Sequence, residues 1–130
     1  MANRWLNGDQ PIADVRYALE GVAAVYVEHG PVLRALAEAA GADAHVETTY
    51  RGLVQAFIDA TARHIRQQQV AGRIPPNLDA HETARALIWL NERYLSEAFG
   101  TTPHSDVAIV VATLHHIWTA TLYGSDTSAP

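Results

Sequence analysis

Apolar side chains recur every three or four positions along most of this sequence, the spacing that places them on one face of a helix. The pattern predicts a helix over residues 11–29 that begins at a proline, a residue suited to the first helical position. Pro31 then opens a short, Ala-rich helix that ends near Gly41. Asp43 suits the start of a long helix, which we expect to run to about Val70.

Prolines and glycines also divide the second half of the chain. The segment AGRIPPNLD (71–79) ends the long helix and forms an extended connector, because two consecutive prolines cannot continue a helix. Asp79 and Glu82 resemble a capping box, which predicts a helix over residues 80–99. A last helix follows residue 104 or 105 and ends near Tyr123, and no alternating strand pattern is present. The sequence therefore predicts an all-α fold, an antiparallel helical bundle of about five main helices.

The last helix is apolar or small on nearly every side. One stripe runs from Val107 to Leu122, and the other side carries small and polar residues with hardly a charge. A helix of this kind is normally covered on both sides. Because a single domain has few elements left to cover the second side, we expect a partner subunit there and hence a homodimer.

An Asn-Glu-Arg triplet interrupts the apolar segment ALIWLNERYLSEAFG (86–100). On a helical wheel, Asn91 lies at the centre of the apolar face and Glu92 at its border. Arg93 points almost the opposite way, beside Trp89. A buried amide without a partner costs about 1–3 kcal/mol. Two interpretations of Asn91 remain open: a core amide bonded to a neighbouring hydroxyl or carbonyl, and a polar anchor in an apolar ligand pocket.

Aromatic and hydroxyl residues fall on the inward stripes of the other predicted helices. They are Tyr26, Tyr50, Phe57, Thr61 and Trp118. By periodicity alone, such a set is more often part of a solid core than the lining of a pocket.

Composition narrows the classes of function. The chain has 130 residues, the size of one domain, and 48% of them are hydrophobic. Its 9 basic residues, all Arg, and 14 acidic residues give 9 − 14 = −5, so we expect no binding of duplex DNA by this chain alone. It has no Cys, no apolar run of the roughly 20 residues that span a bilayer, and no signal-peptide layout at its start. We expect a cytoplasmic protein without membrane contact.

The sequence shows no catalytic or metal-binding motif. His115 and His116 are adjacent and would point about 100° apart on a helix, so they cannot share one ion. The segment HETAR (81–85) lacks the second His of a zinc protease motif, and neither a Gly-rich phosphate loop nor a G-x-S-x-G motif occurs. We expect no enzyme activity, no metal and no cofactor.

Two stretches carry a resemblance beyond the helical pattern. The segment GRIPPNLDAHETARAL (72–87) resembles the joint before the penultimate helix of TetR-family transcriptional regulators. LNERYLSEAFG (90–100) and HHIWTATLYG (115–124) resemble helices of the mycobacterial branch of that family that controls ethionamide activation. The resemblance covers residues 11–124. It implies a helical domain that binds a ligand and dimerises through its last two helices, with operator DNA bound by a separate N-terminal helix-turn-helix domain.

No helix-turn-helix segment is found in this sequence. Residues 1–10 are expected to be a lead-in, residues 11–124 the ligand-binding and dimerisation domain, and residues 125–130 a flexible tail. The resemblance implies a narrow apolar tunnel in which Asn91 matches an amide that bonds the ligand's carbonyl. The implied ligand-binding residues are Tyr26, Tyr50, Phe57, Thr61, Ile88, Asn91, Glu92, Leu95 and Trp118. The implied dimer interface comprises Trp89, Arg93, Ala108, Ala112, His115 and Thr119.

The leading functional hypothesis is therefore the small-molecule-sensing and dimerisation domain of a TetR-like repressor, with an apolar ligand. The alternative is a helical protein-interaction or scaffold domain with a solid core and no ligand.

Overall fold

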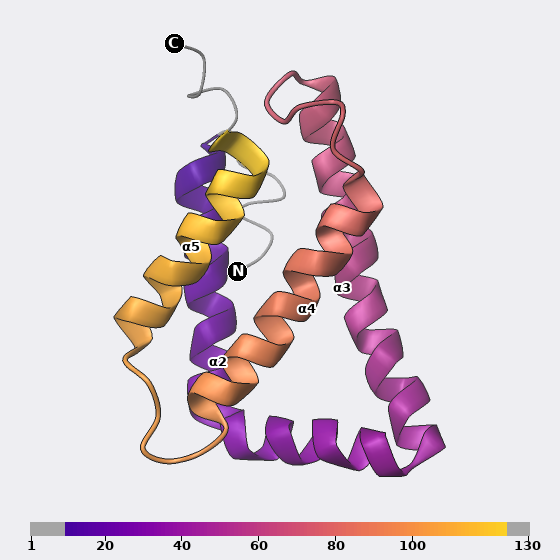
Figure 1. Ribbon diagram of the computed structural model, residues 1–130, viewed down its shortest axis with the longest axis vertical. Coiled ribbons are helices and arrows are strands. Elements are labelled where there is room, and N and C mark those ends of the chain that lie inside the picture. The colour runs from indigo at the N-terminus through magenta and orange to yellow at the C-terminus, as the bar shows by residue number, and fades with distance from the viewer. Residues whose placement is uncertain (1–9, 125–130) are drawn as a thin grey trace.

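The computed structural model describes residues 10–124, which form four α-helices and no β-strand (Figure 1). In chain order they are α2 (Pro11–Ala42), α3 (Ala44–Val70), α4 (Ala80–Phe99) and α5 (Val107–Tyr123). The all-α prediction is confirmed. Apart from Gln10, the expected lead-in and tail lie outside the described residues. Within the described part of the chain, no helix has the length and apolar character needed to cross a bilayer.

The prediction of two separate helices before Asp43 is wrong, because α2 continues through Pro31 to Ala42. Figure 1 shows that α2 turns sharply partway along its length, so that its two parts run in very different directions. Proline lacks an amide hydrogen, and its ring displaces the carbonyl four residues earlier, here that of Val27. A kink rather than an end is the result when both flanking segments remain packed. The helix count is therefore four in the described residues, instead of about five.

Aspartates begin the other three helices. Asp43 Oδ1 accepts hydrogen bonds from the backbone amides of His45 and Val46 at 2.9 and 3.1 Å, which confirms its expected position at a helix start. Asp79 Oδ1 accepts from the amide of Glu82 at 2.8 Å. Asp106 Oδ1 accepts from the amide of Ile109 at 3.2 Å and caps α5. This helix therefore begins at Val107, slightly later than the sequence pattern indicates. Each cap satisfies amides that have no partner within the helix.

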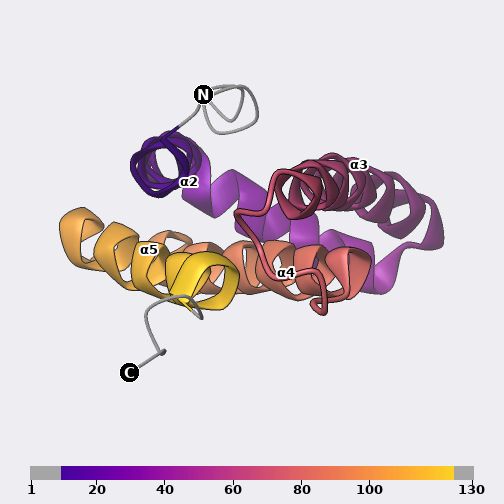
Figure 2. The same ribbon diagram turned by 90° about the horizontal axis from the view of Figure 1, so that it is seen from above.

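The helices lie in two layers. Seen from above, the first part of α2 and α3 occupy one layer and α4 and α5 the other (Figure 2). The helices α3 and α4 lie close together next to their connector and diverge toward the opposite end, where the second part of α2 passes (Figure 1). The largest fully buried side chains come from all four helices and the connector: Val15, Ile58, Ile65, Ile74, Leu95, Leu114 and Leu122.

Two glutamines at the end of α3 hold the connector and α5 in place. Gln69 Nε2 donates to the carbonyls of Pro75 and Leu78 at 3.0 and 2.8 Å. Gln68 is buried, and its Oε1 accepts a hydrogen bond from the Tyr123 hydroxyl at 3.1 Å. These bonds fix the end at which α3, α4 and α5 converge.

Candidate functional site

Asn91 of α4 and Trp118 of α5 are joined by a buried hydrogen bond, in which the indole Nε1–H donates to Asn91 Oδ1 at 3.0 Å. An indole nitrogen is only a donor, so the amide oxygen must face Trp118 and the NH₂ group must face elsewhere. The oxygen of Asn91 thus has a partner within the protein, and this partner is an indole instead of the expected hydroxyl or carbonyl. The bond to Trp118 occupies the oxygen alone, so the NH₂ group is the part of this amide that can donate a hydrogen bond.

Glu92 lies close to two tyrosines from the other layer. Burial, together with the charge of Glu92, raises the pKa of Tyr26 to about 12. Burial and the same carboxylate raise the pKa of Tyr50 still further. Both hydroxyls therefore stay protonated at neutral pH. Glu92 Oε2 is buried and has no hydrogen-bond partner among the described residues.

The remaining expected ligand-binding residues divide into three groups. Thr61 and Leu95 are buried in the packed core, and Ile88 is half-buried against it. Phe57 is 61% exposed, so its expected inward position is wrong. The buried face of α3 is centred between Val54 and Ile58. The predicted stripe was too wide to exclude Phe57, which lies about 80° from that centre at roughly 100° per residue.

Two hollows open on the surface, and neither includes Asn91 or Trp118. One, of about 180 Å³, lies between the second part of α2 and the start of α3. It is lined by Leu36, His45, Val46, Thr49, Tyr50 and Leu53. The other, of about 400 Å³, lies between α2 and α5 and is lined by Arg16, Glu20, Val107, Ala108 and Val111. The sequence pattern did not predict the first hollow, because the second part of α2 lies beside the start of α3 only as a result of the kink in α2.

Two of the expected dimer-interface residues have partners within the chain. Trp89 is half-buried, with the guanidinium of Arg51 5.4 Å from its ring centroid. His115 Nε2 donates to the carbonyl of Ile12 at 2.9 Å. The reason is the same in both cases, since a helical wheel gives the direction of a side chain but not the position of neighbouring helices. The helix α5 packs against α2 near His115.

The other four expected interface residues lie nearer the surface. Arg93 is exposed and pairs with Glu97 at 3.5 Å. Ala108 and Ala112 are exposed, and Thr119 is half-buried with its hydroxyl bonded to a carbonyl of its own helix. The most exposed apolar side of α5 carries Ile109 and Ile117 instead.

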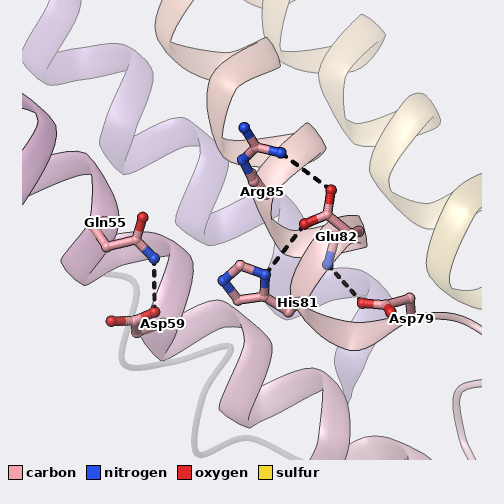
Figure 3. A network of polar contacts seen from close by, with 6 residues as sticks. All are labelled: Gln55, Asp59, Asp79, His81, Glu82 and Arg85. Atoms are coloured by element: carbon pink, nitrogen blue, oxygen red, sulfur yellow. Dashed lines mark hydrogen bonds and ion pairs between the residues drawn. The ribbon is translucent and has the colours of Figure 1, made fainter.

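The HETAR segment forms the polar start of α4 (Figure 3). Glu82 accepts from Arg85 at 3.2 Å and lies 3.3 Å from His81 Nδ1, while its own amide bonds to Asp79. Beside it on α3, Gln55 donates to Asp59 at 2.9 Å (Figure 3). Over residues 10–124, no group of three His, Cys, Asp or Glu side chains is arranged to hold a metal ion. This network stabilises the helix start and is not a metal centre.

A four-helix domain with a buried Asn–Trp hydrogen bond in a mainly apolar core fits the class of helical C-terminal domains of TetR-type transcriptional regulators. The family model for the C-terminal domain of the transcriptional regulator EthR matches residues 15–124. The match extends over most of the chain, which therefore belongs to the EthR C-terminal domain family.

The chain is similar to two regulators of mycobacterial origin. The HTH-type transcriptional regulator EthR of Mycobacterium tuberculosis (strain H37Rv) is 36% identical over 99 residues, covering 75% of this chain and 46% of that protein. EthR of Mycolicibacterium smegmatis is 31% identical over 120 residues, covering 88% of this chain and 54% of that protein. The chain thus spans about half the length of the curated relatives it matches.

Proposed function

We propose that this chain is the small-molecule-sensing and dimerisation domain of a TetR-like repressor, and that it binds an apolar ligand between its helices. Its family and its relatives, which are HTH-type transcriptional regulators, support this proposal. In such a regulator, operator DNA is bound by a separate N-terminal domain. Ligand binding shifts the helical domain toward the conformation that binds the ligand better, and this changes the distance between the two DNA-binding units.

The orientation of the Asn91 amide carries the proposal. Trp118 holds the amide oxygen, which leaves the NH₂ group to donate to a carbonyl on a ligand. A few fixed polar groups among apolar walls are the usual composition of small-molecule sites. In this proposal the ligand contacts Asn91 and the surrounding Tyr26, Tyr50, Ile88, Glu92 and Trp118. Thr61 and Leu95 lie behind them in the core, and Phe57 contributes from the rim.

Thermal denaturation with and without ligand tests this function. Alkyl tertiary amides, which carry a carbonyl acceptor, should raise the melting temperature, whereas hydrocarbons of equal size should raise it less. A ligand at one hundred times its Kd stabilises the native state by about 2.7 kcal/mol through mass action. No shift with any of a panel of apolar carbonyl compounds would contradict the proposal and favour the scaffold alternative with a solid core.

The dimerisation half of the proposal rests on the outward side of α5. Ile109 is 64% exposed, and the exposed Thr113, Ile117 and Ala120 follow it along the same side. We expect Ile109→Glu to convert a dimer to a monomer in sedimentation at micromolar concentration, because it places a charge in an apolar interface. Phe57→Glu is the matched control: it changes an equally exposed apolar residue on α3 and should leave the mass unchanged. A dimer that persists in Ile109→Glu would exclude this side of α5.

A further inference from the structure

Glu92 carries a buried oxygen without a hydrogen bond, and its carboxylate forms no ion pair among residues 10–124. Its Oε2 is buried without a partner among the described residues. Arg93, the next residue along α4, pairs with Glu97, while Arg51 of α3 pairs with Glu47 and stacks on Trp89. The Tyr50 hydroxyl hydrogen-bonds to the Glu92 carboxylate, so the carboxylate has one donor from the chain. Its Oε2 still accepts no hydrogen bond among the described residues, which is costly, and a donor on a bound molecule would satisfy it.

Tyr50 connects this carboxylate to the surface. It lines the hollow between α2 and α3, and it is also one of the two tyrosines whose pKa is raised by Glu92. The other walls of the hollow are mainly aliphatic, from Leu36, Val46 and Leu53. The hollow of about 180 Å³ is smaller than the roughly 300–1,000 Å³ of typical ligand sites. Rotation of the Tyr50 side chain would join the hollow to the carboxylate and enlarge it.

We propose that the ligand of this domain carries a hydrogen-bond donor or a positive charge that Glu92 accepts, next to an apolar body that lies in the hollow beside Tyr50. This inference rests on the proposed ligand-binding function and adds the chemical class of the ligand. Asn91 supplies a donor, and Glu92 supplies an acceptor one residue further along α4. The site therefore suits amines and N–H amides and rejects carboxylates, because a negative group would lie against an unpaired carboxylate.

Four compounds with the same apolar chain test the inference by calorimetric titration of the full chain: decylamine, decanamide, methyl decanoate and decanoate. We expect the amine and the amide to bind about tenfold more tightly than the ester, as a hydrogen bond to a charged group allows. Decanoate should bind most weakly. If the ester or the carboxylate binds as tightly as the amine, this inference is overturned and the ligand-binding function stands. If none of the four binds, the proposed function itself is contradicted.

Two charge-neutralising variants locate the effect. Glu92→Gln should reduce the preference for decylamine over methyl decanoate to about twofold, because the amide no longer offers a negative acceptor. Glu97→Gln on the same helix removes the same charge from an exposed, paired position and should keep the tenfold preference. Since both variants change the net charge equally, general attraction of a cation to an acidic protein cannot produce a difference between them. Equal preferences in the two variants would overturn the role of Glu92, and the ligand series on the unaltered chain stays decisive if Glu92→Gln does not fold.

Discussion

Replacing Gly30 with alanine should destabilise the fold by about 2–3 kcal/mol, measured as the free energy of unfolding in a denaturant titration. A Cβ at this position would overlap the carbonyl oxygen of Phe99 and lie 2.8 Å from its carbonyl carbon. Both are backbone atoms at the end of α4, so no side chain can rotate away to make room. The kink in α2 and the end of α4 would have to separate.

Gly52→Ala provides the control for helix propensity. Gly52 lies within α3, is exposed, and has nothing within 4 Å of the added Cβ. Alanine there should stabilise the protein by about 0.5–1 kcal/mol, because glycine is the more costly residue inside a helix. A Gly30→Ala protein as stable as the parent would show that α2 and α4 do not approach one another as closely as this structure has them.

The second large effect is expected at the hydrogen bond between α4 and α5. Asn91→Leu removes the acceptor and leaves the buried indole N–H of Trp118 unsatisfied, which should cost about 1–3 kcal/mol of stability. Trp118→Phe removes the donor and also leaves a space, so it should cost at least as much. Because the two residues share one interaction, the double variant should lose about 1 kcal/mol less than the sum of the single variants.

Unfolding curves for the four proteins of this double-mutant cycle give the coupling free energy directly. Asn77→Leu, in the exposed connector, is the comparison for an Asn that has no part in the core, and it should change stability by less than about 0.5 kcal/mol. Strictly additive effects of Asn91→Leu and Trp118→Phe would mean that the bond does not hold the two helices together.

The sequence predicted the helical content and the buried position of Asn91 correctly, because both depend on local rules. Asp43 and Asp79 begin their helices as their capping chemistry requires. The wheel also placed Asn91 correctly on the buried face of α4, since that direction depends only on the spacing of its apolar neighbours.

The errors arise where tertiary packing decides. A proline after a glycine ends a helix in most settings, but Pro31 kinks α2 because Gly30 lets this helix contact the end of α4. The direction of Trp89 about its helix axis was correct, yet Arg51 from α3 covers it. The pairing of Asn91 with Trp118 was likewise beyond the sequence pattern, because it depends on the register between two helices.

The divergence of α3 and α4 gives this small domain two ends of unequal rigidity. Every buried residue of α3 lies at or after Val54, and none lies among residues 44–53. Local opening free energies follow the density of buried contacts, so the end near Gln68 and the connector opens only with the whole molecule, whereas residues 44–53 open at a fraction of that cost. The hollow and Tyr50 lie at this less stable end. A molecule that enters there reorganises side chains whose packing contributes little to global stability. The end near Gln68 and the connector meanwhile keeps α3, α4 and α5 in register.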